Sequence, residues 1–134
     1  MSLDLGTKRV GVAISDELRL TIRPLPALPR SSWKRLVNDL KELRRNFDVK
    51  TIVIGLPLRL DGTEGDAALD AQRIADKLSL SLDVPVHMQD ERLTSKAAEE
   101  RLRQAGYNRK EISARVDSEA AVFILQEYFG RTGG

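Results

Sequence analysis

Three acidic residues, Asp4, Glu91 and Asp117, stand where carboxylates could do chemistry. Asp4 sits between two leucines near the end of the first predicted strand, Glu91 follows a predicted strand, and Asp117 begins the last predicted helix. Counted from Asp117, apolar residues recur at the spacing of one helix face, which places its carboxylate at the top of the stripe facing the sheet. A carboxylate on a buried face is costly unless something compensates its charge.

Three compensations are open for Asp117. It could cap its own helix, which is worth about 1 kcal/mol, it could pair with a Lys or Arg, or it could share a cation with Asp4 and Glu91. Three convergent carboxylates need Mg²⁺ or Mn²⁺, because the chain has no Cys and a single His, and hard oxygen ligands favour these ions over zinc. Two such ions can activate a water and stabilise the leaving oxygen of a phosphodiester.

The elements that must position these carboxylates follow from hydrophobic periodicity and turn residues. The predicted order is β-β-β-α-β-α-β-α-α, and an antiparallel meander followed by crossovers indicates an α/β, mixed five-stranded sheet with helices on both faces. This is the order of the ribonuclease-H-like fold. The predicted strands are residues 3–5, 10–15, 21–28, 51–55 and 84–89; the helices are one beginning after Ser31 or Ser32, then 66–82, 94–104 and 117–129; residues 57–65 and 106–115 are loops.

Length and composition indicate one folded domain. The 134 residues are expected to form a single domain over residues 1–130, with a flexible tail at 131–134. The absence of Cys excludes a disulfide scaffold and a thiolate nucleophile. No basic stretch followed by an apolar run opens the chain, and no apolar run is long enough to span a bilayer, so a cytoplasmic protein is expected.

Glycines and basic residues mark a possible contact with phosphate. Gly6 and Gly11 bracket the first turn, where a side chain would keep a phosphate from the backbone, and Lys8 and Arg9 lie at its tip. An ordinary hairpin with charged tip residues explains the same pattern. Residues 1–60 carry twelve Lys or Arg against six Asp or Glu, which fits a basic face for a polyanion or simply solvated helix surfaces.

Four motifs in order give the sequence a resemblance to the YqgF family, whose members are described as Holliday-junction resolvases or pre-16S rRNA nucleases. The resemblance covers nearly the whole chain, and four ordered motifs are far more specific than the first alone. The matching segments are residues 4–13 with 15–16, residues 55–58 followed by 61–65, residues 90–94, and residues 117–121.

The resemblance implies a divalent-metal nuclease of ribonuclease-H-like fold, working in the cytoplasm on rRNA precursors or branched DNA. It implies that Asp4, Glu91 and Asp117 form the site and hold two Mg²⁺ or Mn²⁺ ions, although strand alternation leaves open whether Asp90 or Glu91 is the ligand. Residues 59–65 would shape the cleft, and whether the chain is a monomer or a homodimer stays open. The residues expected to contact nucleic acid are Lys8, Arg9, Arg59, Arg109 and Lys110.

Two rival functions remain. A nucleic-acid-binding factor on the same fold would bind with strong salt dependence and cut nothing. A nucleotide phosphotransferase is suggested by residues 4–7, which resemble the phosphate loop of actin-like ATPases, but those enzymes close two lobes around the nucleotide and this chain supplies one.

Overall fold

A computed structural model describes residues 1–6, 8–57, 65–90 and 94–132. These residues form one sheet of five strands in the order β3-β2-β1-β4-β5, which confirms the predicted mixed α/β architecture. The elements are β1 (Ser2–Leu5), β2 (Arg9–Ser15), β3 (Ile22–Pro29), α1 (Trp33–Asn46), β4 (Ile52–Leu56), α2 (Asp66–Leu82), β5 (Val86–Asp90), α3 (Thr94–Gln104) and α4 (Arg109–Thr132).

The sheet combines an antiparallel and a parallel half. β1 pairs with β2, and β2 with β3, in antiparallel register, whereas β4 and β5 continue from β1 as parallel strands. β3 lies at one edge and carries three prolines, which lack the N–H that a central strand must donate. The carboxyl ends of β1, β4 and β5 therefore meet at the same end of the sheet.

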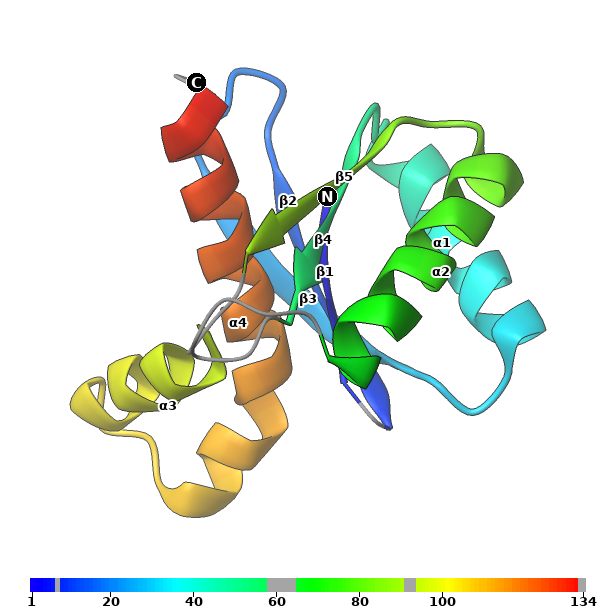
Figure 1. Cartoon of the computed structure of the whole chain (residues 1–134). Coiled ribbons are helices and arrows are strands. Elements are labelled where there is room, and N and C mark those ends of the chain that lie inside the picture. Colours follow the sequence, from blue (N-terminus) through cyan, green and yellow to red (C-terminus); the bar gives the residue numbers. More distant parts are fainter. Residues whose placement is uncertain (7, 58–64, 91–93, 133–134) are drawn as a thin grey trace.

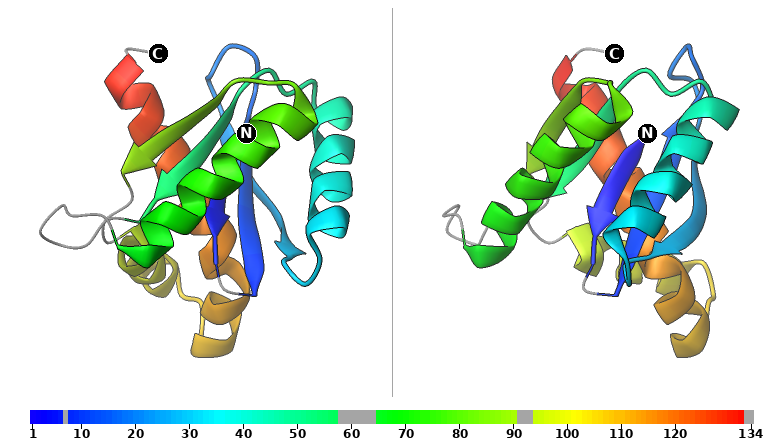
Figure 2. Two further views of the ribbon diagram at one scale, coloured as in Figure 1. Left: turned by 45° about the vertical axis from the view of Figure 1, so that its right-hand side comes forward. Right: turned by 90° about the vertical axis from the view of Figure 1, so that its right-hand side faces the viewer.

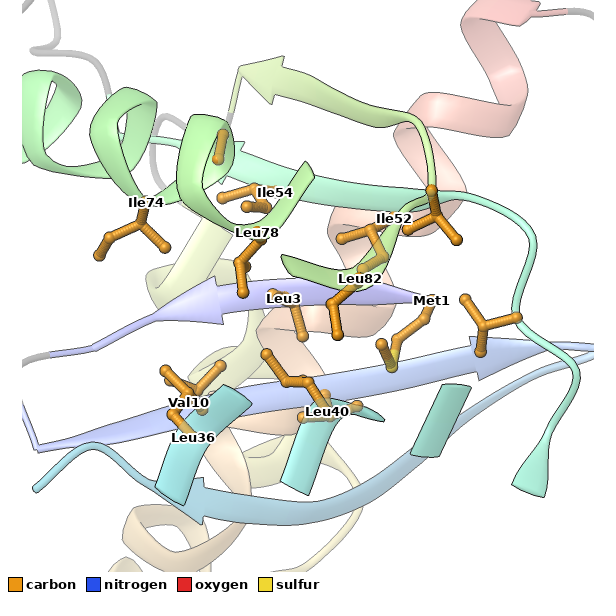
Figure 3. Close-up of a cluster of buried hydrophobic side chains, with 14 of the residues drawn as sticks. Met1, Leu3, Val10, Leu36, Leu40, Ile52, Ile54, Ile74, Leu78 and Leu82 are labelled. Carbon is orange, nitrogen blue, oxygen red and sulfur yellow. The ribbon is translucent and has the colours of Figure 1, made fainter. Parts of the chain in front are cut away.

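One face of the sheet packs against α1 and α2. Alternate residues of the central strands point to this face, and their large aliphatic side chains meet leucines from the two helices in a single cluster. Figure 3 shows this cluster lying along β1, with Leu78 and Leu82 of α2 on one side of the strand and Leu36 and Leu40 of α1 on the other. Leu3, Leu40, Ile54 and Leu78 have no exposed surface, so this layer holds most of the apolar core.

The other face of the sheet is covered by α4, and α3 packs against α4. Figure 1 shows α4 on the side of the sheet opposite α1 and α2, and both turned views in Figure 2 agree with that arrangement. Small residues form one part of this contact, where Ala13 meets Ala121 and Val122, and larger ones form another, where Val53 meets Ile124 and Leu125. Small side chains let the helix approach the strands closely.

The start of α4 differs from the prediction, because the helix begins at Arg109 and not at Asp117. Asn108 and Glu111 form a reciprocal cap: the Asn108 side chain accepts from the Glu111 N–H at 2.9 Å, and the Glu111 carboxylate accepts from the Asn108 N–H at 3.1 Å. The predicted basic loop at 106–115 is thus mostly the first two turns of a helix. At its other end α4 continues to Thr132, and residues 133–134 lie outside the described part.

Candidate active site

Asp4 lies on the face of β1 that is covered by α4, and it is 7% exposed. Leu3 points to the opposite, apolar face, so strand alternation places Ser2 and Asp4 together. The Ser2 hydroxyl donates a hydrogen bond to the Ala121 carbonyl at 2.6 Å, which fastens β1 to α4. The predicted partial burial of Asp4 is confirmed.

The Ser2–Ala121 hydrogen bond fixes which helix residue lies over Asp4. Two residues along β1 cover about 6.6 Å, and four residues back along α4 cover about 6 Å. Because the two elements run in opposite directions, these steps lead from Ser2 to Asp4 and from Ala121 to Asp117. A β-carbon built on Gly6 would lie 3.8 Å from the Asp117 Oδ1, which places that carboxylate at the carboxyl end of β1.

Gly11 makes this close approach possible. It pairs with Asp4 in the sheet and lies directly beneath α4, where a β-carbon would overlap the Asp117 carbonyl group. Gly6 is required for a different reason, since its β-carbon would lie 2.7 Å from the Arg9 carbonyl oxygen, which accepts the Gly6 N–H. The two glycines serve helix docking and the turn itself, so the geometry explains them without the bound phosphate that was predicted.

Ser118 holds α4 at a bulge in the sheet. Between β2 and β3 the register shifts, so that two residues of β3 stand opposite Gly11. The Ser118 hydroxyl bridges this irregularity, accepting the Val12 N–H at 3.2 Å and donating to the Leu25 carbonyl at 2.6 Å. The residue next to Asp117 is thereby buried and fixed by two strands.

Asp117 pairs with Arg9, whose Nε lies 3.0 Å from the Asp117 Oδ2. The Asp117 side chain is 20% exposed and that of Arg9 is 50% exposed. Of the three predicted compensations, capping is wrong, because Asp117 lies two turns inside α4, and the ion pair is present. Arg9 was predicted to contact a phosphate; in this structure its guanidinium stands where it would also meet any anion that approaches Asp117.

Arg30 fixes the turn that carries Lys8 and Arg9. Its guanidinium donates to the Gly6 carbonyl at 2.7 Å and to Asp70 of α2 at 2.7 Å, and its backbone N–H donates to the Lys8 carbonyl at 2.9 Å. Arg30 was not among the predicted site residues. It follows a proline-rich strand and precedes a helix cap, so nothing in its local pattern distinguishes it from a linker residue.

The third predicted carboxylate, Glu91, lies outside the described residues, and so does Arg59. The strand before Glu91 still carries information: Val86 and Met88 pack into the apolar cluster, whereas His87 stacks on Tyr128 of α4 at 5.7 Å between ring centres. Asp90 is in phase with Val86 and Met88, on the face away from Asp4. Strand phase therefore places Asp90 on the face of the sheet opposite Asp4.

Arg109 and Lys110 form the exposed first turn of α4. Eight residues separate Arg109 from Asp117, which is about 12 Å along a helix. These cations therefore lie further from Asp117 than Arg9 does. Within the described residues no three of Asp, Glu and His come close enough together to hold a metal ion.

The described carboxylates suit a hard divalent cation. Mg²⁺ is typically held by one or two protein carboxylates, with waters and substrate phosphates completing its octahedron. Asp4 and Asp117 supply two such groups at one end of the sheet, one buried and one partly exposed. The donor chemistry therefore fits Mg²⁺ or Mn²⁺.

Taken together, the sheet order and the docking of α4 on one face of the sheet define an α/β domain of ribonuclease-H-like fold. The RuvX family, described as Holliday junction resolvase, matches residues 1–131. The chain belongs to this family, which confirms the resemblance to YqgF proteins seen in the sequence and classes the protein as a hydrolase.

Relatives cover almost the whole chain. A protein of Syntrophus aciditrophicus named "Putative pre-16S rRNA nuclease" is 46% identical over 128 residues, covering 96% of this chain and 85% of the relative. A protein of Syntrophomonas wolfei with the same name is 44% identical, covering 96% and 91%.

Among solved structures, Thermus thermophilus RuvC in complex with a Holliday junction substrate is similar, with a TM-score of 0.55 and 16% identity over 98% of this chain and 94% of that chain. At that identity the likeness speaks for the fold alone.

Across the described residues, none of the helices has the length and apolar character needed to cross a membrane.

Proposed function

We propose that this protein is a divalent-metal-dependent nuclease that processes the precursor of 16S rRNA in the cytoplasm, with Asp4, Asp117 and Glu91 as its site residues. The names of its relatives support the RNA substrate, and the Holliday junction in the similar RuvC structure supports branched DNA as the other candidate. Both substrates would present a folded polyanion to the end of the sheet that carries Lys8 and Arg9.

The observation that carries this proposal is the register of α4 on β1. The Ser2–Ala121 hydrogen bond and the absence of a side chain at Gly11 place Asp117 over Asp4, although 113 positions separate the two residues in the sequence. Two acids on touching faces repel each other unless cations accompany them. Arg9 supplies one cation beside Asp117, and a bound divalent metal would add further positive charge between the two acids.

Each residue has a distinct task in the proposed reaction. Asp4 and Asp117, with Glu91, would hold two ions of Mg²⁺ or Mn²⁺, which supply activation of the attacking water and stabilisation of the leaving oxygen. Arg9 and Lys8 draw the phosphodiester towards the carboxylates, Arg30 keeps their turn in place, and residues 59–65 shape the cleft. Arg59, Arg109 and Lys110 contact the strand further away.

The test is cleavage of a 16S precursor transcript and of four-way junction DNA in Mn²⁺, by wild type, Asp4→Asn and Asp117→Asn. Each variant is expected to lose at least about 100-fold in rate, a loss typical of removing one electrostatic group at a reacting centre. EDTA should abolish wild-type cleavage. Asp76→Asn, an exposed carboxylate of α2, is the matched control and should cut like wild type. Equal activity in wild type and both site variants would contradict the proposal.

One observation favours the rival, a binding factor that does not cut. Asp117 already has a cation, Arg9, at 3.0 Å. In that case affinity for RNA would fall steeply with salt, and neither Mg²⁺ nor Mn²⁺ would produce turnover. Measuring affinity and cleavage on the same RNA separates the two functions.

A further inference from the structure

A concave surface lies beside the candidate active site. It is a groove of about 500 Å³ between the edge strand β3 and the carboxyl-terminal half of α3, with α4 as its floor. Its volume falls within the roughly 300–1,000 Å³ range of small-molecule sites. We call it the β3–α3 groove, and the lining residues used below are Pro24, Pro26, Arg101, Tyr107, Arg115 and Ser118.

The groove is lined by planar cations and an aromatic ring. The Arg115 guanidinium lies 4.4 Å from the centre of the Tyr107 ring, and that of Arg101 lies 5.5 Å from the centre of the Phe123 ring. One carboxylate, Glu119, also lines it and pairs with Arg101 at 3.5 Å, and no described carboxylate lies within ion-pair distance of Arg115. The groove therefore carries a net positive charge and flat surfaces on which a ring can stack.

The groove adjoins the candidate site along α4. Ser118 forms part of its floor and directly follows Asp117, and Arg115 precedes Asp117 by two residues, about 3 Å of helix rise. Because side chains two residues apart on a helix point to different sides, a strand whose phosphate lies at Asp117 and Arg9 would reach the groove by following the surface around α4.

We infer that the β3–α3 groove binds one unpaired nucleotide of the RNA strand next to the bond that is cut, an inference that rests on the proposed function. Unpaired bases stack on tyrosine rings and arginine planes, and guanidinium groups bind phosphate oxygens in a bidentate manner. A base paired in a duplex hides both faces and cannot enter. An added peptide strand is disfavoured, because Pro24 and Pro26 give the edge of β3 no N–H at two positions.

The test measures affinity in EDTA, so that nothing is cut. Fluorescence anisotropy compares an eight-nucleotide single-stranded RNA with the same sequence in a duplex, for wild type and Tyr107→Ala. The single strand is expected to bind the variant about 10-fold more weakly, within the range of one lost base stack, whereas duplex affinity changes less than about twofold. Tyr107→Phe keeps the ring and should bind like wild type.

Arg103→Ala is the matched control, because Arg103 is an exposed arginine of α3 that pairs with Glu100. A second measurement does not depend on Tyr107→Ala folding: RNA with one unpaired 4-thiouridine should cross-link wild type within residues 101–118, mapped by mass spectrometry. Cross-links elsewhere, unchanged single-strand affinity, equal losses for single strand and duplex, or full competition by a poly-glutamate peptide would overturn the inference.

The outcomes separate this inference from the proposed nuclease function. Loss of single-strand binding in Tyr107→Ala together with no metal-dependent cleavage by wild type would keep the groove and reject the nuclease. Metal-dependent cleavage with unchanged Tyr107→Ala affinity would keep the nuclease and reject the groove.

Discussion

The two faces of the sheet are built by opposite rules. The face under α1 and α2 is made of large aliphatic side chains that no polar contact orients. The face under α4 combines glycine, alanine and serine around one buried carboxylate with a smaller aliphatic cluster, and two serine hydroxyls fix the helix to the strands. The first face supplies stability through buried area, and the second supplies position.

The difference lies in how much displacement each packing permits. Aliphatic side chains can change rotamer when a neighbour is removed, so an apolar layer relaxes partly around a defect. Backbone in contact with backbone cannot relax without moving the whole helix, and hydrogen bonds lose strength as their angle changes. Asp117 is thus held on the more precise of the two faces, as a site that must orient reacting groups requires.

The largest stability effect is expected on the apolar face. Leu40→Ala removes a fully buried side chain of α1 and should lower the free energy of unfolding by about 2–5 kcal/mol. Cleavage measured well below the melting temperature should stay within about threefold of wild type, because α4 is untouched. Urea denaturation and initial rates on the same preparation check both. A loss of activity as large as that of Asp117→Asn would show that the two faces are coupled.

The reverse pattern is expected for Gly11→Ala. The new methyl group overlaps the Asp117 carbonyl and lies 2.9 Å from the Ser118 nitrogen, so α4 must shift. Overpacking of this kind costs about 1–3 kcal/mol, and a misplacement near 1 Å can cost about 100-fold in rate. Initial cleavage rates should therefore fall by about 100-fold, while urea denaturation should show a loss of about 1–3 kcal/mol in the free energy of unfolding.

Gly130→Ala is the matched control for that experiment. Gly130 also lies in α4, but a β-carbon there meets nothing within 4 Å. Its replacement should leave cleavage unchanged and stabilise the helix by about 0.5–1 kcal/mol. If both glycine variants behaved alike, close docking at Gly11 would not matter to the site.

Ser118→Ala tests the hydrogen bonds of the same face. It leaves the Val12 N–H and the Leu25 carbonyl without their bridging hydroxyl, and an unsatisfied buried group costs about 1–3 kcal/mol. The rate at saturating RNA should fall by a larger factor than RNA affinity in EDTA, because Ser118 positions Asp117. Ser79→Ala, an exposed serine of α2, is the control. Reduced affinity with an unchanged rate would contradict this role.

The elements of the apolar face were predicted well from the sequence, because the spacing of apolar residues within each strand and helix shows which of its sides is buried. The limits of α2 and α3 were predicted residue for residue, and the prolines within residues 21–28 predicted a sheet edge or an extended loop, of which the structure shows the edge. The position of Asp4 on the face opposite Leu3 followed from the alternation of side chains along a strand. Local patterns suffice wherever the burial of a residue follows from the periodicity of the strand or helix that contains it.

The α4 face was harder to predict, because its meaning depends on contacts between distant elements. Gly11 and Ser118 acquire their roles only when the helix lies on the bulge, more than 100 residues away in the sequence. The early start of α4 had a local signal, the Asn108 and Glu111 cap, which was overlooked because the first two turns are polar. Arg30 had no local signal at all.

The smallest expected effect concerns the positive charge of Arg9, which matters both to the proposed nuclease and to the rival binding factor. Arg9→Gln removes a half-exposed cation from Asp117, so the free energy of unfolding should change by less than about 1 kcal/mol. Without RNA, Mn²⁺ should bind more tightly, because a positive charge near the metal position is gone; about 1 kcal/mol of repulsion near bulk water corresponds to roughly fivefold in Kd. RNA should bind more weakly, with a shallower salt dependence.

These opposite signs make the experiment sharp. Calorimetric titration with Mn²⁺ and anisotropy with RNA would be run on Arg9→Gln and on Arg103→Gln, whose arginine pairs with Glu100 on α3. The control should leave Mn²⁺ affinity unchanged. If Arg9→Gln weakened Mn²⁺ binding, Arg9 would be supporting the metal position and not competing with it. The Arg9–Asp117 ion pair would then belong to the metal-bound site. The precise positioning on the α4 face would in that case include the partly exposed carboxylate of Asp117.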